Sequence, residues 1–261
     1  MNGLNQFAIK QTGDAEEACP DSQEVACAQC KLHGFLKFFE GSDLLSLNIF
    51  LSRRIPVAKG AILFDAVAPF RGIYAVKSGS FKSFSHQDPS GDQILGFSLP
   101  GELIGLDALH SSQYGYSTVA LEASSVCWLP FEHLDVLGER MAFFQEQVIR
   151  ILVDQVRHDH HQTLLVGRRT AEERLGAFLL NLSDRYRRHG FEGEAFRLPM
   201  LQNDMANYLG LSMETVSRTL RGFREQEVVS IQGKRLRILN EDCLRSIAHA
   251  CRGGGDSAGP G

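Results

Sequence analysis

The chain has 261 residues, of which 43% are hydrophobic and 22% are charged, and its formal net charge is −4. These values are typical of a globular protein with one large domain or two modest ones, and they exclude a wholly disordered or collagen-like chain. The charge is unevenly distributed, because residues 167–239 contain 13 Lys and Arg against 9 Asp and Glu (+4), which leaves 14 against 22 (−8) elsewhere. A basic C-terminal third on an acidic body is expected where one part of a protein binds phosphate groups.

Residues 1–40 are predicted to be a separate, cysteine-bearing N-terminal segment. The chain begins MNGLNQFAIK, which lacks the features of a signal peptide, and no apolar run is long enough to cross a bilayer. We therefore expect a cytoplasmic protein with no membrane partner, in a compartment where thiols stay reduced. Three of the six cysteines, Cys19, Cys27 and Cys30, lie within twelve residues, and we expect free, metal-binding or redox-active thiols rather than disulfides.

Residues 41–132 are predicted to form an antiparallel β-roll. After an amphipathic stretch at 42–51, which predicts a helix, short apolar runs such as 73–76 and 126–129 are bounded by turn residues. Glycines recur at intervals of 7 to 12 residues, at Gly60, Gly72, Gly79, Gly91 and Gly101. Many short strands with regularly spaced turns are typical of a roll or a sandwich.

Residues 133–166 are predicted to form one long dimerisation helix. Its seam positions are separated by alternating gaps of three and four residues and are Ile149, Leu152, Val156, Asp159, Thr163 and Val166. This is the spacing of a coiled-coil seam, so the helix is predicted to pair with a second copy of itself. Asp159 is the one charged residue at these positions, and it would place a carboxylate on the contact line between the two helices. Alternatively, Asp159 lies at a solvated end of the seam.

Residues 167–245 are predicted to form a DNA-binding domain, followed by a disordered tail at 246–261. Thr170 and Glu173 match a capping box, in which each side chain bonds a free backbone amide at the start of a helix. Gly190 is the natural end of that helix.

Residues 202–220 predict a helix, a tight turn and a second helix. Ala206 is small where two helices would cross closely, and Gly210 lies where the turn favours a positive φ. Ser212 is a suitable N-cap for the second helix.

The second helix of this pair is predicted to have two distinct faces. At about 100° per residue, four polar side chains fall within about 100° of one another. They are Glu214, Ser217, Arg218 and Arg221, and the opposite, apolar face contains Met213, Val216, Leu220 and Phe223. Arg can donate two hydrogen bonds to guanine, Glu can accept one from cytosine, and Ser can bond several bases or a phosphate. We therefore expect this polar face to read the major groove of double-stranded DNA.

A β-hairpin wing is predicted after this helix, at 228–238. Its Lys234, Arg235 and Arg237 are placed to bind phosphates. Cys243 and Cys251 lie beyond the wing and are interpreted as free thiols near a frayed tail.

These motifs resemble the Crp–Fnr family of bacterial transcription regulators, and closely its oxygen-responsive Fnr branch, from about Cys27 to Cys243. The strongest matches are 74–79 (YAVKSG), 93–97 (QILGF), 121–122 (LE), 126–127 (VC), 130–132 (PFE), 171–175 (AEERL), 208–211 (YLGL) and 214–218 (ETVSR). The resemblance implies an α+β fold with a cyclic-nucleotide-binding-like β-roll, a long dimer helix and a winged helix-turn-helix. It also implies that Glu214, Ser217 and Arg218 read palindromes with TTGAT-like half-sites as a homodimer.

The resemblance further implies a [4Fe–4S] cluster, which requires four cysteine thiolates. Cys127 matches the ligand from the β-roll, and Cys27 and Cys30 match the first close pair of the N-terminal set. The usual third cysteine downstream is missing here, and Cys19, eight residues upstream of Cys27, is the candidate that replaces it. A zinc site on the same thiols, or an unligated N-terminus with Cys127 as a small core residue, are the alternatives.

Two further roles follow from the resemblance. Val156 and Asp159 match seam positions that control dimerisation, and paired Asp159 carboxylates would repel one another until cluster binding reorders the roll and the helix. Oxygen would then return the protein to a weakly associating form. Gly91 and Asp92, together with 191–196, match surfaces that Fnr-like activators present to RNA polymerase.

Other functions are weighed against this one. The first alternative is a regulator of the same family that has no cluster and responds instead to thiol redox state, zinc or a small molecule. A cyclic-nucleotide receptor is not favoured, because Gly101 and Glu102 fit but 109–120 contains no Arg or Lys to pair with a phosphate. An enzyme is not expected either, because His86, His110 and His133 are scattered rather than gathered in a metal-binding triad.

Overall fold

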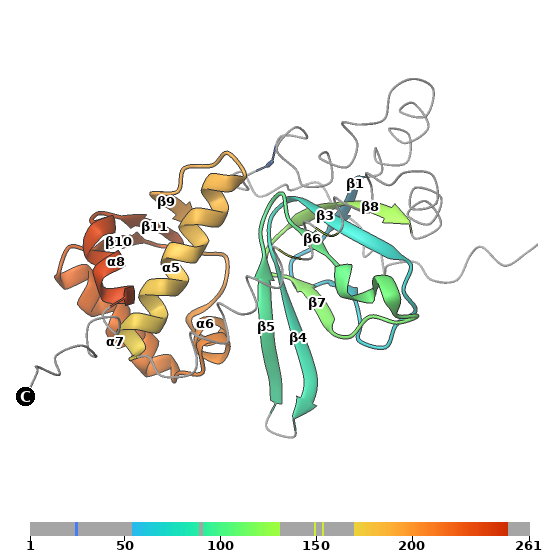
Figure 1. Ribbon diagram of the computed structural model, residues 1–261, viewed down its shortest axis with the longest axis horizontal. Coiled ribbons are helices and arrows are strands. Elements are labelled where there is room, and N and C mark those ends of the chain that lie inside the picture. The colour runs from blue at the N-terminus through green and yellow to red at the C-terminus, as the bar shows by residue number, and fades with distance from the viewer. Residues whose placement is uncertain are drawn as a thin grey trace, which may run out of the picture. The chain divides into compact units, whose positions relative to one another are not determined.

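The computed structural model describes residues 24–25, 54–88, 91–130, 149, 153 and 170–249 (Figure 1). The chain divides into two compact units, Met1–Glu139 and Arg140–Gly261. The prediction for 42–51 lies outside the described residues, as does the boundary near Gly167. The tail was predicted to begin at residue 246, but residues 246–249 belong to a helix, Glu241–His249, and only 250–261 lie outside the described residues. None of the described helices is long and apolar enough to span a membrane.

The described part of the first unit forms two four-stranded antiparallel sheets. One has the order β1-β8-β3-β6, formed by β1 (Arg54–Val57), β8 (Ser124–Pro130), β3 (Gly72–Ser78) and β6 (Leu103–Ile104). The other has the order β2-β7-β4-β5, formed by β2 (Ile62–Phe64), β7 (Ser117–Ala120), β4 (Phe81–Asp88) and β5 (Gly91–Ser98). A short 3-10 helix, η2 (Leu106–His110), follows β6. The predicted antiparallel roll is confirmed.

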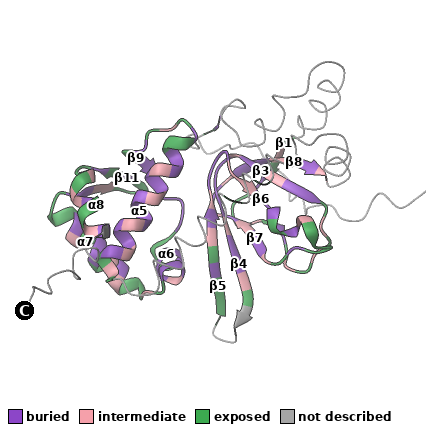
Figure 2. Ribbon diagram, viewed as in Figure 1, coloured by how far each residue is buried: buried purple, intermediate pink, exposed green. Residues whose placement is uncertain are grey.

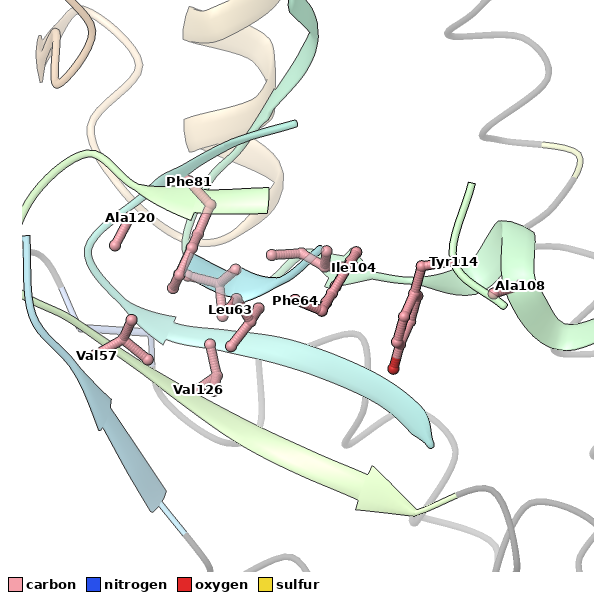
Figure 3. Packing of buried hydrophobic residues seen from close by; sticks show 10 residues of the cluster. Val57, Leu63, Phe64, Phe81, Ile104, Ala108, Tyr114, Ala120 and Val126 are labelled. Atoms are coloured by element: carbon pink, nitrogen blue, oxygen red, sulfur yellow. The ribbon is translucent and has the colours of Figure 1, made fainter. Parts of the chain in front are cut away.

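The roll is filled by side chains from both sheets (Figure 3). The buried cluster consists of Val57, Leu63, Phe64, Val76, Phe81, Ile104, Ala108, Tyr114, Ala120 and Val126. Phe64 stacks on Tyr114, with ring centroids 3.8 Å apart. Burial of each large apolar side chain of this kind contributes about 1.5–3 kcal/mol to folding, so the cluster is the main source of stability of the roll.

Gly79 joins β3 to β4 in a conformation that only glycine accepts readily. Its φ is 75°, and a Cβ at this position would lie 2.1 Å from the Ser124 hydroxyl. The sheets therefore close tightly at this corner, which explains one of the regularly spaced glycines.

Residues 170–249 of the second unit form four helices and a three-stranded sheet (Figure 1). In chain order the elements are α5 (Ala171–Arg188), β9 (Ala195–Arg197), α6 (Gln202–Leu209), α7 (Met213–Glu225), β10 (Val229–Gln232), β11 (Arg235–Ile238) and α8 (Glu241–His249). The sheet order is β10-β11-β9 and its ladders are antiparallel. Buried residues follow one side of α5 and the inner side of α7 (Figure 2).

Helix α5 begins and ends as the sequence predicts. The Thr170 hydroxyl accepts a hydrogen bond from the Glu173 amide at 3.2 Å, and the Glu173 carboxylate accepts one from the Thr170 amide at 2.8 Å. The helix ends at Arg188, and Gly190 follows with a φ of 80°. Both predicted signals are therefore confirmed.

Two elements of this unit differ from the predictions. Strand β9 occupies part of 191–196, which was interpreted as a surface segment, and its Phe196 is only 1% exposed because β9 pairs with β11. Cys243 does not lie near a frayed tail, since it is half-buried within α8.

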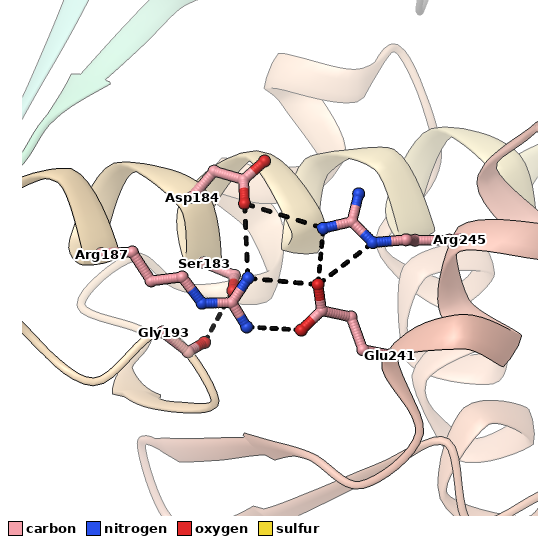
Figure 4. Close-up of polar contacts among 6 residues, drawn as sticks. All are labelled: Ser183, Asp184, Arg187, Gly193, Glu241 and Arg245. Carbon is pink, nitrogen blue, oxygen red and sulfur yellow. Dashed lines mark hydrogen bonds and ion pairs between the residues drawn. The ribbon is translucent and has the colours of Figure 1, made fainter.

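Helix α8 is fastened to α5 by a group of charged side chains (Figure 4). Glu241 accepts hydrogen bonds from the two terminal nitrogens of Arg187 and from Arg245 Nη2, the last at 2.5 Å. Asp184 lies 3.5 Å from Arg187 and 4.0 Å from Arg245. The hydrogen bonds from Arg187, and next those from Arg245, lower the pKa of Glu241 to about 2.

Candidate nucleic-acid interface and sensor segment

The turn between α6 and α7 has the predicted geometry. Gly210 has a φ of 62°, and the Leu211 amide donates to the Ala206 carbonyl at 2.9 Å. The Ser212 hydroxyl accepts from the Thr215 amide at 3.1 Å and so caps α7. The positive φ of Gly210 and the N-cap hydrogen bond of Ser212 are therefore both confirmed, and the two helices form a helix-turn-helix arrangement.

A contact that the sequence did not predict also holds this turn. Arg174, on α5, donates from Nη1 to the carbonyls of Leu209 and Gly210 at 3.0 and 3.3 Å. These carbonyls lie at the end of α6, where helical partners run out. Arg174 was noted only as part of a family motif, because nothing local shows that its side chain reaches a turn 35 residues away.

Helix α7 presents its polar residues outward, with one correction. Val216, Leu220 and Phe223 are at most 4% exposed and face the core of the domain. The polar face carries exposed Glu214, Arg218 and Arg221 and half-buried Ser217. Met213, predicted on the apolar face, is instead 53% exposed. It is the first residue of α7 and borders the polar face on the wheel, so its side chain projects past the core.

The wing is also confirmed as a hairpin. Gln232 pairs with Arg235 across the turn, and Gly233 has a φ of 59°. Lys234, Arg235 and Arg237 are exposed, whereas Leu236 and Ile238 alternate with them toward the core. Such a row of cations beside a polar recognition helix is suited to the phosphates that flank a major groove.

The sensor residues are divided between the β-roll and the undescribed segment. Cys127 lies half-buried on β8, paired with Arg54 on β1 and with Ala75 on β3. Its neighbour Val126 belongs to the core, so Cys127 lies on the opposite face of the sheet. Trp128, the single tryptophan of the chain, follows it, and its indole nitrogen is buried without a hydrogen-bond partner among the described residues.

The other predicted ligands and the seam pair lie outside the described residues. These are Cys19, Cys27, Cys30, Val156 and Asp159. Within the part of the chain that the structure describes, no group of three or more His, Cys, Asp or Glu could hold a metal ion. Ile149 and Val153 are described, and both are helical and exposed, by 59% and 44%.

Residues 24–25 dock on the β-roll against β3, the strand beside that of Cys127. The Val25 amide donates to the Lys77 carbonyl at 3.0 Å, and the Lys77 ammonium donates to the Val25 carbonyl at 2.5 Å. Glu24 forms ion pairs with Arg54 at 3.4 Å and with Lys77 at 3.3 Å. Sequence reasoning missed this contact, because the two residues carry no motif and their partners are distant in the chain.

The predicted polymerase-facing pair lies at the start of β5. The Asp92 carboxylate approaches His86 Nδ1 to 2.6 Å, and both side chains are exposed on the β4–β5 hairpin. Nearby Gly91 has a φ of 120°. Of 191–196, Glu192 and Glu194 remain exposed.

Comparisons with known proteins agree on both units. Residues 54–141 match the model of the cyclic nucleotide-binding domain, and 173–247 match that of the Crp-like helix-turn-helix domain. The chain is 42% identical over 206 residues to the transcriptional activator protein anr of Pseudomonas aeruginosa, covering 79% of this chain and 84% of that protein. It is 40% identical over 226 residues to the fumarate and nitrate reduction regulatory protein of Vibrio cholerae, covering 86% and 90%.

Solved structures show the same architecture. The structure of FixK2 from Bradyrhizobium japonicum has a TM-score of 0.68 and 26% identity, covering 74% of this chain and 96% of that one. A CRP-family transcriptional regulator from Thermus thermophilus, at 19% identity and a TM-score of 0.59, covers the same shares and has the same fold. The named relatives are regulators of transcription rather than enzymes.

Proposed function

Because the chain belongs to the Crp/Fnr family of DNA-binding transcription regulators, we propose that it is a homodimer that responds to oxygen through a [4Fe–4S] cluster. Cys19, Cys27, Cys30 and Cys127 are the proposed ligands. When bound, such a cluster supplies an oxygen-labile centre that ties the N-terminal segment to the roll. The dimer then reads palindromic DNA with TTGAT-like half-sites.

The docking of residues 24–25 is the observation that carries the sensor proposal. Cys127 lies one strand across and two residues along from Lys77, a separation of about 7–9 Å. Cys27 is two residues from Val25, and two extended residues span at most about 7 Å. Covalent geometry therefore allows Cys27 to approach the Cys127 thiol.

The charges around Cys127 suit the proposed group. Thiolate ligands leave a cysteine-bound [4Fe–4S] centre with a net negative charge. Arg54 lies directly opposite Cys127 in the β1–β8 register, and Lys77 lies on the strand at its other side. Their two positive charges exceed the single negative charge of Glu24, which pairs with both, and the remaining positive charge would offset that of the centre and stabilise the thiolates.

The DNA-reading proposal assigns roles by exposure and position. Glu214, Ser217 and Arg218 would contact base edges, and Arg221 would extend this face along the groove. Lys234 and Arg235 on the wing would bind phosphates. The exposed apolar side chains of Ile149 and Val153 support a helix that a second copy covers, with Val156 and Asp159 as the proposed switch.

Contact with RNA polymerase is proposed for the β4–β5 hairpin, through Gly91 and Asp92. The exposed Asp92 carboxylate supports this assignment.

A cyclic-nucleotide response is not supported by the roll. The Glu102 carboxylate accepts a hydrogen bond from the Leu99 amide at 2.9 Å and so holds a turn of its own chain. Stacked Phe64 and Tyr114 occupy the interior. Calorimetric titration with cyclic AMP tests this alternative, and heat of binding would favour it.

The function is tested by purification without oxygen. We expect brown protein with visible absorbance, about four iron and four sulfide per chain, and binding of a TTGAT palindrome that air abolishes. Colourless, metal-free protein that still binds the palindrome would contradict the cluster proposal. Protein that contains zinc but no sulfide would favour the zinc site instead. Cys19→Ser tests whether Cys19 is a cluster ligand, because loss of a ligand should lower the iron content of the purified protein.

A further inference from the structure

We infer that Glu24, Arg54 and Lys77 form a clasp that docks the cysteine-bearing segment across the strand of Cys127. The inference deepens the proposed function, because it identifies what presents the N-terminal thiols to the β-roll. All the described contacts of the clasp are between protein groups, so the clasp can be tested in the metal-free protein.

The clasp straddles β8. In the sheet order β1-β8-β3-β6, Arg54 belongs to β1 and Lys77 to β3, so the two cations lie on either side of β8. The two carboxylate oxygens of Glu24 are divided between them, Oε2 at 3.4 Å from Arg54 and Oε1 at 3.3 Å from Lys77. One carboxylate thus spans the strand that carries Cys127.

The clasp lies on the same face as the thiol. Arg54 Nε donates to the Ser125 hydroxyl at 3.0 Å, and Ser125 precedes Cys127 by two residues, which places both on one face of β8. The register pair of Arg54 and Cys127 gives the same result.

A buried polar pair supports the clasp from below. Ser78 and Ser125 are at most 4% exposed, and their hydroxyl oxygens lie 2.7 Å apart in a hydrogen bond. Hydroxyls are costly to bury unless they are bonded, and these two are satisfied by one another and by Arg54. The pair therefore fixes the direction in which Arg54 points toward Glu24.

The backbone completes the docking. Glu24 forms an antiparallel bridge with Ser78, and Val25 is fully buried between its two hydrogen bonds to Lys77. The pair of Glu24 with Arg54 is half-exposed, with the side chains 46% and 50% accessible, and is weak alone, whereas the Lys77 side chain of the second pair is only 14% accessible. Together they bias the segment toward the docked position while leaving it reversible.

Crosslinking between Cys27 and Cys127 in the metal-free, reduced full chain tests the clasp. The other four cysteines are replaced by Ser, and a short bifunctional thiol reagent measures the rate of intramolecular bridging. Glu24→Lys should slow bridging about 3- to 10-fold, since both ion pairs are lost and replaced by repulsion. The double variant Glu24→Lys, Arg54→Glu, which keeps the Lys77 hydrogen bond to the Val25 carbonyl, should recover part of the rate.

Asp65→Lys is the matched control, because it makes the same charge change on an exposed residue of the roll outside the clasp. Glu24→Gln, which keeps the shape of the side chain, should give an intermediate rate, and circular dichroism checks that each variant is folded. Equal rates for Glu24→Lys and the parent would overturn the clasp even if the cluster is found. If Glu24→Lys slows bridging as expected but the protein does not bind iron when purified without oxygen, the cluster proposal is overturned and the clasp stands.

Discussion

At the scale of single residues, the DNA-reading surface separates into side chains that specify and side chains that attach. Arg218 is exposed on α7, where a fork of donors can meet a base, whereas Lys234 is exposed at the tip of the wing. Their chemistry differs accordingly, because a base contact distinguishes sequences and a phosphate contact does not. This difference makes a matched pair of substitutions informative.

Arg218→Ala should weaken binding of the TTGAT palindrome by about 1–3 kcal/mol, or about 5- to 150-fold, and relax discrimination at one base pair. Lys234→Ala should weaken binding to all sequences alike and reduce the salt slope by about 1. Fluorescence anisotropy at several salt concentrations, with matched and mismatched duplexes, measures both. Identical effects of the two changes would contradict the division of roles.

Arg174 is expected to act on specificity through position alone. Arg174→Ala removes the bonds to the Leu209 and Gly210 carbonyls, so α7 should tilt and the ratio of specific to non-specific affinity should fall about 3- to 10-fold. Arg174→Lys, which retains a donor, should restore part of the ratio. If the affinities for specific and non-specific DNA fall by the same factor, or if Arg174→Lys restores none of the ratio, then Arg174 does not position α7.

At the scale of elements, the sequence predicts best what is local. The cap of α5, the turn at Gly210 and the wing all depend on neighbours within a few residues, and each is found where expected. Strand β9 escaped prediction because its three residues are strand only through pairing with β11. The contact of Glu24 with Arg54 escaped for the same reason, since 30 residues separate partners that share no pattern.

The junction of α5 and α8 gives a pH-dependent prediction. The pKa of Glu241 is lowered from 4.5 to about 2, so its contribution to stability is present above about pH 4.5 and is lost as pH falls toward 2. Glu241→Gln should therefore lower the free energy of unfolding by about 1 kcal/mol at pH 6, and the gap from wild type should narrow by pH 3.

Denaturant unfolding followed by far-ultraviolet circular dichroism measures that gap. Glu192→Gln, a change of an exposed carboxylate in the same unit, is the control and should leave stability nearly unchanged at both pH values. A gap for Glu241→Gln that is constant from pH 6 to pH 3 would show that the ion pairs with Arg187 and Arg245 are not its source.

At the scale of the whole molecule, the proposal requires two copies to pair along one helix. Ile149 and Val153 offer apolar surface there, while Asp159 would bring two carboxylates together on the expected contact line. Association would then be weak unless the helix or its surroundings change. The sensor would control the balance between burial of this apolar surface and repulsion of the two Asp159 carboxylates.

Asp159→Ala should dimerise and bind the palindrome in air, because the repulsion and the desolvation of the paired carboxylates are removed. Sedimentation velocity and anisotropy in aerobic buffer measure the two outcomes. Asp154→Ala, on the same predicted helix but off the seam, should remain monomeric in air. An Asp159→Ala protein as oxygen-sensitive as wild type would place the switch elsewhere.

The single tryptophan has a practical consequence for all of these experiments. Trp128 directly follows Cys127 on β8. Tryptophan emission, excited at wavelengths that the tyrosines do not absorb, therefore comes from one fluorophore adjacent to the sulfur whose chemistry is in question, and an iron centre there would quench it. Loading, loss and repair of that centre can be followed in real time in unlabelled protein.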